Sequence, residues 1–160
     1  MTGDPDYQLI FIDNSRMRGL AFSSFSLKEV NRIGICPNQS HLISASGKNF
    51  FRLYKVEEYA FKPLDEVKKL PKNRNFTEHT WCEKTKILLG TDRGEIFLVG
   101  PIGNSYEVKR EFLNAFNEPS PEISVTAICP FSKGFILGSD QGKFALWVKK
   151  EDNEDNYDDE

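Results

Sequence analysis

Short apolar runs of four to eight residues, separated by turn-forming residues, recur along most of the 160-residue chain. Runs of this length, bounded by Gly, Pro, Asn and Asp, predict β-strands. Residues 92–94 (Asp-Arg-Gly) and 140–142 (Asp-Gln-Gly) are typical of tight hairpin turns, because glycine readily adopts the positive φ that they need. Segment 62–69 would suit a helical turn, but Pro63 and Pro71 bracket it and favour a loop. The pattern therefore predicts an all-β chain.

The predicted strands form an initial pair and three larger units. The pair covers 9–12 and 16–24. The units have strands near 30–36, 41–46, 50–56 and 58–62; near 76–82, 86–91, 95–99 and 105–112; and near 123–129, 134–139 and 143–149. Each unit reads as an antiparallel meander, so the chain begins on the third strand of one unit and ends on the third strand of another.

An internal repeat relates the three units. The hydroxyl residues Ser46, Thr91 and Ser139 lie 45 and 48 residues apart. A large apolar residue follows each of them by eight positions (Tyr54, Val99 and Trp147). The tripeptide Ile-Cys-Pro, at 35–37 and 128–130, ends nine residues before two of the hydroxyls. A four-stranded repeat of this length indicates the blades of a β-propeller.

The repeat resembles the WD-repeat β-propeller family, in which a strand end, a hydroxyl and an aromatic residue recur at fixed spacing. Two sets of residues carry the resemblance: Pro37, Ser46 and Tyr54, and then Pro130, Ser139 and Trp147. No Gly-His pair precedes any unit, and Asp92 and Asp140 sit one place early for the family's polar network. The resemblance implies a partial WD-repeat β-propeller over residues 1–150, with about three four-stranded antiparallel blades.

A narrower resemblance covers residues 28–150. Segments 79–81 (His-Thr-Trp), 86–92 and 131–135 are similar to part of the first propeller of the family of cilia- and flagella-associated protein fifty-seven. That family has two tandem propellers and a long coiled coil, and lies along the ciliary axoneme at the bases of inner dynein arms near the regulatory complexes. This chain has no coiled-coil heptads. The resemblance implies a non-catalytic scaffold of the axoneme, in the cytoplasm and cytoskeleton, with axonemal partners. The alternative is a WD-repeat scaffold subunit of a non-ciliary cytoplasmic complex.

Charge divides the chain into a body and a tail. Residues 151–160 hold seven acids and no base, while the body keeps all 21 bases and 17 of the 24 acids, a net charge of +4. The tail has too little apolar surface to fold and is predicted to be disordered. The body is too weakly basic, and too poor in exposed stacking aromatics, to favour nucleic acid. The apolar runs, Leu9 to Ile12 among them, are far too short to span a membrane.

One basic cluster stands out as a candidate binding site. Lys68, Lys69, Lys72 and Arg74 surround a Leu-Pro pair in a predicted loop between blades. One interpretation is a solvated loop, and the other is a contact for an acidic protein surface. We expect no cofactor, since no phosphate-binding loop follows a strand and no set of residues has metal-ligand spacing.

The chain also offers no catalytic constellation. His79 is interpreted as structural, at the start of a strand, and Asp92 and Asp140 as turn residues on neighbouring blades rather than a shared carboxylate pair. Cys36 and Cys129 occupy equivalent strand positions and are predicted to be buried. The odd count of three cysteines, without a short Cys pair, favours a reducing compartment. The sequence therefore favours a scaffold over an enzyme.

Three blades are too few to close a ring. Propellers typically have four to eight blades, and each blade needs neighbours to bury its faces. Both ends are therefore expected to expose an apolar face. The missing surface has to come from the remainder of a longer propeller, from another chain or from self-association.

Overall fold

The computed structural model describes residues 8–24, 29–117, 122–149 and 157–159, and in these it contains strands and no helix. The strands are β1 (Gln8–Asp13), β2 (Arg18–Ser24), β3 (Val30–Cys36), β4 (Gln39–Gly47), β5 (Phe50–Glu57), β6 (Ala60–Pro63), β7 (Phe76–Cys82), β8 (Lys86–Thr91), β9 (Ile96–Ile102), β10 (Ser105–Phe112), β11 (Val125–Phe131), β12 (Gly134–Ser139), β13 (Phe144–Lys149) and β14 (Tyr157–Asp159). Each predicted strand overlaps an observed one. The all-β prediction is confirmed.

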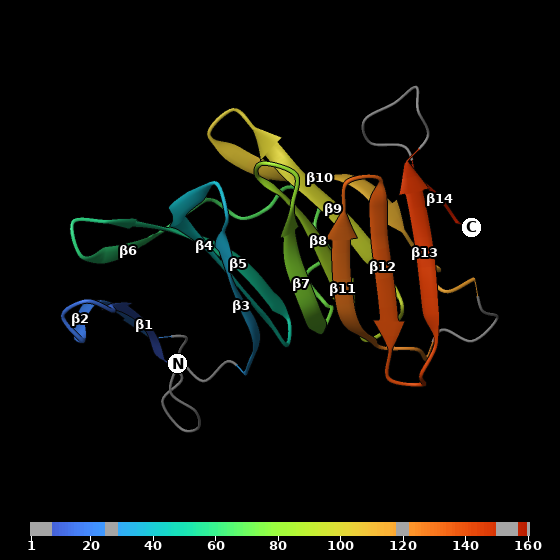
Figure 1. Cartoon of the computed structure of the whole chain (residues 1–160), viewed down its shortest axis with the longest axis horizontal. Coiled ribbons are helices and arrows are strands. Elements are labelled where there is room, and N and C mark those ends of the chain that lie inside the picture. Colours follow the sequence, from blue (N-terminus) through green and yellow to red (C-terminus); the bar gives the residue numbers. More distant parts are fainter. Residues whose placement is uncertain (1–7, 25–28, 118–121, 150–156, 160) are drawn as a thin grey trace.

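Four antiparallel sheets follow one another along the chain. An N-terminal hairpin, β1–β2, precedes a first blade (β3–β6), a middle blade (β7–β10) and a last blade (β11–β14), and in each blade the strands pair in chain order. Figure 1 shows the sheets side by side, fanning out from the hairpin to the last blade. Both β3 and β11 contact β7, so the first strands of successive blades line one edge of the fan. This is the arrangement of part of a β-propeller.

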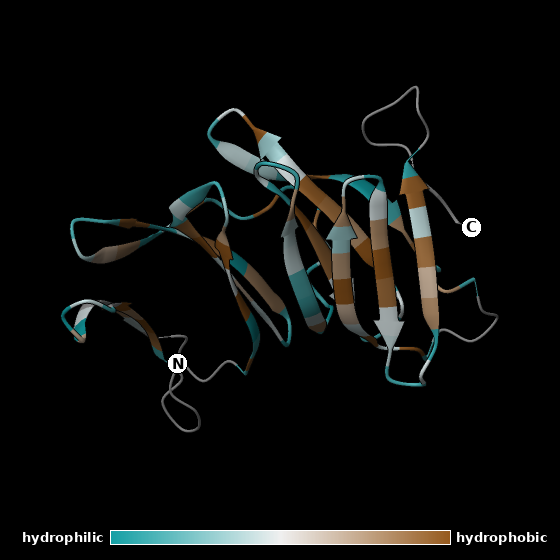
Figure 2. Cartoon of the chain, in the orientation of Figure 1, coloured by the Kyte–Doolittle hydropathy of each residue, from teal (hydrophilic) through white to brown (hydrophobic). Residues whose placement is uncertain are grey.

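Apolar side chains fill the three spaces between neighbouring sheets. Leu9, Ile43 and Phe50 belong to the layer between hairpin and first blade. Leu53, Phe76 and Phe97 belong to the layer between first and middle blades, and Leu98, Phe112 and Phe135 to the layer between middle and last blades. Figure 2 shows hydrophobic residues concentrated along β8, β9 and β12. Burial of each large side chain stabilises the fold by about 1.5–3 kcal/mol.

The middle blade is covered on both faces. Side chains alternate between the faces of a strand, so Ile87 and Leu89 join the layer on the first blade while Leu88 joins the layer on the last blade. A strand that is buried on both sides reads in sequence as a continuous apolar run, and Lys86–Thr91 has that pattern. The turns between β8 and β9 and between β12 and β13 contain Gly94 and Gly142 with φ of 67° and 72°, as predicted.

The repeat register in the first blade differs from the register that the sequence predicts. The repeat places Tyr54, Val99 and Trp147 in equivalent positions. Across the sheet, Tyr54 pairs with Ile43, Val99 pairs with Ile87, and Trp147 pairs with Phe135. On this basis Ser46 is equivalent to Gly90, and the prediction that it matches Thr91 is wrong by one residue.

The cause is a shorter turn in the first blade. Gly47 pairs with Phe50, so the turn there holds two residues, whereas Gly90 pairs with Ile96 across a turn of five. Asn49, with φ of 60°, provides the left-handed conformation that the two-residue turn requires. Ser46 lies on the face of β4 that packs against the middle blade, opposite the face of Ile43 and Ala45.

The acidic tail contains one short strand. Tyr157–Asp159 forms β14, which pairs antiparallel with β13 through Trp147, Val148 and Lys149. The sequence predicts disorder throughout 151–160, and the structure differs from that prediction at these three residues; residues 151–156 and 160 lie outside the described residues. Without β14, the backbone NH and CO groups of β13 would form an open sheet edge. This edge provides hydrogen-bond partners for β14, and the composition of the tail gives no indication of that pairing.

The two cysteines at equivalent positions have different environments. Cys36 is buried, and its Sγ donates a hydrogen bond to the carbonyl oxygen of Lys84 in the middle blade at 3.4 Å. Cys129 is exposed, so the prediction that both are buried is wrong for Cys129. The difference arises because the middle blade covers the first blade, while no described residue covers the corresponding face of the last blade.

Candidate interaction site

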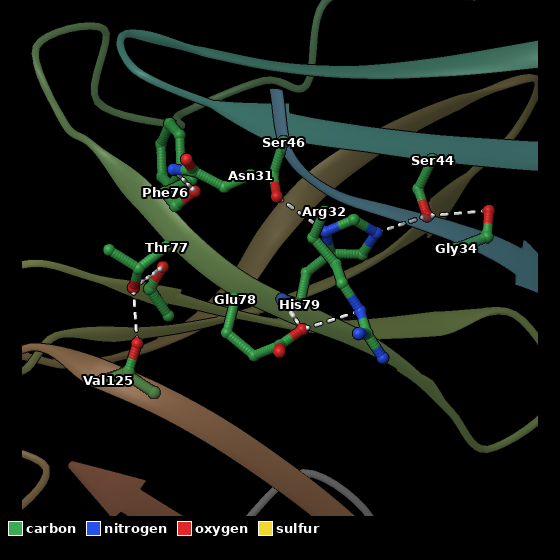
Figure 3. Close-up of polar contacts among 11 residues, drawn as sticks. Asn31, Arg32, Gly34, Ser44, Ser46, Phe76, Thr77, Glu78, His79 and Val125 are labelled. Carbon is green, nitrogen blue, oxygen red and sulfur yellow. Dashed lines mark hydrogen bonds and ion pairs between the residues drawn. The ribbon is translucent and has the colours of Figure 1, made fainter. Parts of the chain in front are cut away.

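A buried histidine joins the first blade to the middle blade. His79 lies in the middle of β7, and its imidazole lies between two serine side chains of β4 (Figure 3). Ser44 Oγ is 2.7 Å from Nε2, and Ser46 Oγ is 2.8 Å from Nδ1. Ser44 and Ser46 point the same way because they are two residues apart in one strand. All three side chains are fully buried.

The hydrogen bonds select one tautomer of this histidine. Ser44 Oγ donates to the carbonyl oxygen of Gly34 at 3.3 Å, so towards the ring it acts as an acceptor. Nε2 of His79 therefore carries the proton, and Nδ1 accepts the hydrogen of Ser46. Burial, together with the positive charge of Arg32, lowers the pKa of His79 to about 3. The imidazole is neutral at physiological pH and serves as a connector between blades.

This arrangement does not support catalysis. Nucleophilic attack by Ser44 would require access to a substrate, and both Ser44 and His79 are enclosed between the sheets. The nearby carboxylate of Glu78 accepts a hydrogen bond from the backbone NH of His79 at 2.8 Å and pairs with Arg32 at 3.0 Å, so it does not orient the imidazole. The expected structural role of His79 agrees with this geometry. Ser44 and Ser46 were not identified as its partners from the sequence. The available signal was the presence of two serines at alternate positions among the apolar residues of a strand.

The basic segment lies in the loop between β6 and β7. Val67 is buried in the layer between the first and middle blades. Lys68 forms a backbone bridge to β10, with its NH donating to the carbonyl of Tyr106 at 2.9 Å and its own carbonyl accepting from the NH of Val108 at 3.1 Å. The loop is therefore attached to the outer strand of the middle blade, with its polar side chains directed away from the core.

The four cations that the sequence groups together have separate roles. Arg74 is partly buried and donates two hydrogen bonds to Glu95, at 2.7 and 3.1 Å. The hydrogen bond from Arg74 to the Glu95 carboxylate raises the pKa of the guanidinium. Lys69 pairs with Glu107 at 3.6 Å, and Lys72 pairs with Glu66 at 3.4 Å. In the described part of the chain, Lys68 is exposed and has no ion pair.

A small cavity opens beneath this loop. It measures about 130 Å³ and lies between the turn that joins β4 to β5 and the segment 66–72. Phe51 and Phe76 contribute apolar surface, while Arg52, Glu66 and Lys72 contribute charges. A hollow lined by both apolar and charged side chains is suited to an anchoring side chain of a protein partner. The loop and the cavity together form the candidate interaction site.

A second cavity lies at the other end of β4. It measures about 510 Å³ and is lined by residues of both blades, including His41, Lys55, Thr85 and Tyr106. Ser105 also lines it, and its buried hydroxyl has no hydrogen-bond partner among the residues that the structure describes. Neither cavity gathers a metal-binding set: the described residues contain no group of three or more His, Cys, Asp or Glu that could hold a metal ion.

The remaining sequence candidates are not brought together. Asp92 and Asp140 lie in the turns after β8 and β12, on different blades, and Asp140 accepts a hydrogen bond from the NH of Ser124 at 3.0 Å. Among the described residues, no helix has the length and apolar character needed to cross a membrane.

Comparison with known proteins identifies two similarities. Cilia- and flagella-associated protein 57 A of Tetrahymena thermophila is 27% identical over 165 residues, which cover 96% of this chain and 12% of that relative. The β-propeller domain of Cps50 (Swd1) from Myceliophteria thermophila superposes with a TM-score of 0.70 at 13% identity, covering 92% of this chain and 48% of that one. No family model matches the chain. The protein thus has the fold of part of a WD-repeat β-propeller, and its sequence resembles cilia- and flagella-associated protein 57.

Proposed function

We propose that this protein is a non-catalytic scaffold of the ciliary axoneme, located near the inner dynein arms. The observation that carries this proposal is the 27% identity to a ciliary protein over 96% of the chain. The propeller fold supports it, because blades present turns and loops to partners and need no catalytic residues. The position near the inner dynein arms and their regulatory complexes follows from the family resemblance of residues 28–150.

The alternative is a WD-repeat scaffold of a non-ciliary cytoplasmic complex. The structural likeness to the Cps50 (Swd1) propeller, at 13% identity, is equally compatible with either role because it concerns the fold alone. Tagging the protein at its own locus in a ciliated cell separates the two. We expect the tag along the axoneme after detergent extraction of the membrane. A tag confined to the detergent-soluble cell body would reject the axonemal role.

The partner contact is proposed to centre on the basic loop. Lys68, Lys69 and Lys72 are exposed, and their loop borders a hollow that Lys72 lines together with apolar and charged side chains. Lys69 and Lys72 form ion pairs with Glu107 and Glu66, but exposed ion pairs contribute at most about 1 kcal/mol. Carboxylates of a partner can therefore replace Glu66 and Glu107 as the ion-pair partners of these lysines. An acidic segment carrying one apolar side chain would fit this surface. We leave Arg74 out of the proposed contact, because its guanidinium is hydrogen-bonded to Glu95.

A charge-reversal experiment tests this surface. The triple variant Lys68→Glu, Lys69→Glu, Lys72→Glu is compared with a control, Lys84→Glu with Lys133→Glu, whose exposed lysines lie in the turns after β7 and β11. Purified protein is sedimented with salt-washed axonemes. We expect the triple variant to bind about tenfold more weakly and the control to bind like wild type. Equal binding by all three proteins would eliminate the loop as the contact.

A further inference from the structure

The larger cavity lies between the first and middle blades, at the end of β4 away from the basic loop, and is called the interblade cavity below. Its walls come from the start of β4, the end of β5 and the turns that join β7 to β8 and β9 to β10. Its volume of about 510 Å³ is typical of a ligand-binding site. Leu42, Ser105 and Tyr106 are buried in its wall, whereas His41 and Asn104 are exposed. The interblade cavity therefore has a buried floor and an open side.

Ser105 places an unpaired hydroxyl in this wall. The residue is 9% exposed, and its Oγ has no hydrogen-bond partner in the described part of the chain. A two-residue turn, with Gly103 at a φ of 57°, pairs Ser105 with Ile102 and fixes the serine at the start of β10. A buried hydroxyl without a partner destabilises a protein, and such groups are rare. Ser105 is therefore placed to bond with a group that enters from outside.

The interblade cavity is lined by a lysine and by no carboxylate. Lys55 is part of its wall, and no Asp or Glu is among the described residues that line it. Lys55 pairs with Glu57 at 2.5 Å, but Glu57 also pairs with Lys62 at 2.9 Å. Such exposed pairs are weak, and Glu57 keeps Lys62 if Lys55 turns towards a ligand. Lys55 is therefore available to an anion that enters the cavity.

Neutral hydrogen-bond donors from both blades line the same cavity. Gln39 and Asn104 contribute amide groups, and Thr85 and Tyr106 contribute hydroxyls. The hydroxyls of Thr85 and Tyr106 are hydrogen-bonded to each other, which uses one of their two hydrogens. Burial raises the pKa of Tyr106, so its hydroxyl stays protonated at neutral pH and the second hydrogen is free for a ligand. The lining is therefore suited to a ligand that is rich in acceptors.

We propose that the interblade cavity binds a phosphorylated serine or threonine side chain of a protein partner. A phosphate group carries nearly two negative charges and accepts hydrogen bonds at three oxygens, which matches Lys55, Ser105 and the neutral donors around them. A carboxylate has one charge and two oxygens and would leave more of these donors unused. The contact rests on the scaffold function proposed above, and it adds the chemistry of one segment that the scaffold holds.

Backbone amide chemical shifts of the isotope-labelled 160-residue chain give the first test. The probe is phosphoserine with an acetyl group at one end and a methylamide at the other, compared with capped serine, capped glutamate and inorganic phosphate. We expect capped phosphoserine to shift the amides of Thr85, Ser105 and Tyr106, with a dissociation constant on the order of 1 mM. Capped glutamate should bind at least ~5-fold more weakly, and capped serine should cause no shifts.

The comparison probes separate the other possible ligands. Equal binding of capped glutamate would assign the cavity to an acidic side chain, and equal binding of inorganic phosphate would assign it to the free ion; either result overturns the proposal. Absence of shifts at these amides also overturns it. The axonemal role is tested independently by localisation of the tagged protein, so a failed titration would leave that role standing.

A lysine substitution with a matched control gives the second test. Lys55→Gln removes the cation that lines the cavity, and we expect the dissociation constant of capped phosphoserine to rise about tenfold. The control is Lys62→Gln, which also removes one partner of Glu57 but lies outside the cavity lining, and it should bind like wild type. Equal affinities of the two variants would show that Lys55 does not contact the ligand.

A serine substitution separates binding from folding. Ser105→Ala should weaken the binding of capped phosphoserine about tenfold. Its thermal midpoint should be unchanged or higher, because the substitution removes a buried hydroxyl that has no partner. Ser132→Ala, at an exposed position in the turn after β11, should change neither value. A lower midpoint of Ser105→Ala with unchanged affinity would mean that the hydroxyl serves the fold, and the proposed site would be wrong.

Discussion

Arg74 and Glu95 form a two-hydrogen-bond ion pair that attaches the loop after β6 to the turn between β8 and β9. The nitrogen–oxygen distances are 2.7 and 3.1 Å, and the hydroxyl of Thr91 donates a third hydrogen bond to the same carboxylate at 3.1 Å. Glu95 is buried, and these donors are the hydrogen-bond partners of its carboxylate. The pair therefore supports the fold, in contrast to the exposed lysines beside it.

Replacing Arg74 should destabilise the protein. Arg74→Ala leaves the buried carboxylate of Glu95 without its cationic partner, and we expect a loss of about 2–3 kcal/mol in the free energy of unfolding. Lys72→Ala, in the same loop, should change it by less than about 0.5 kcal/mol. Urea denaturation measures both. Equal effects of the two substitutions would contradict the assignment of separate roles.

Replacing His79 should loosen the junction between the first and middle blades. His79→Ala removes a buried ring and leaves the hydroxyls of Ser44 and Ser46 without their partner, so we expect a loss of about 3–5 kcal/mol. Thr126→Ala serves as the control, because the hydroxyl of Thr126 is exposed. Thermal unfolding followed by circular dichroism compares them, and a small effect at His79 would show that the junction does not stabilise the fold.

The same histidine should make stability depend on pH. Its pKa is about 3 in the folded protein and about 6.5 when the chain is unfolded, so the unfolded chain takes up a proton first as the pH falls. Stability should therefore decrease as the pH falls from about 6.5 towards 4.5, with a slope approaching about 1.4 kcal/mol per pH unit. In His79→Gln this slope should be lost. Identical slopes would refute the buried neutral state.

Trp147 should contribute to the layer between the middle and last blades. Its ring stacks on Phe135 at a centroid distance of 6.2 Å, and its Nε1 donates to the carbonyl oxygen of Ala115 at 3.0 Å. We expect Trp147→Ala to cost about 3–5 kcal/mol and Trp147→Phe to cost about 1 kcal/mol, since the phenyl ring keeps the packing and loses the hydrogen bond. Chemical denaturation provides the values. A loss below 0.5 kcal/mol for Trp147→Ala would place this residue outside the core.

The thiols should react at different rates. In a Cys82→Ser background, Cys129 should react with a thiol reagent at once in dilute protein, while Cys36 should react only after unfolding. Equal reactivity of Cys36 and Cys129 in the folded protein would contradict their different exposures.

The strand pattern was predictable because it depends on local periodicity. Every predicted strand overlaps an observed one, and the glycine turns after β8 and β12 have the expected positive φ. The register of the first blade was not predictable in the same way. A two-residue turn and a five-residue turn both join apolar strands, and the sequence spacing from Ser46 to Tyr54 equals that from Thr91 to Val99 although the pairing differs.

The features that the sequence missed depend on contacts between distant segments. The partners of His79 lie 33 and 35 residues away, on another blade. Arg74 was grouped with its neighbouring lysines because local charge does not reveal Glu95, 21 residues further along. The exposure of Cys129 likewise depends on which segment packs on its blade. The tripeptide Ile-Cys-Pro is the same around Cys36 and Cys129, so the local sequence does not distinguish a buried cysteine from an exposed one.

The double coverage of the middle blade has a consequence for the order in which the chain opens. Cooperativity in a row of units passes between nearest neighbours, and an interior unit opens only when it separates from both. We therefore expect the amide hydrogens of β7, β8 and β9 to exchange with solvent most slowly, and those of β1 and β13 to exchange through partial openings of the ends. The middle blade would then be the last part to unfold, although its own sheet has no more strands than its neighbours.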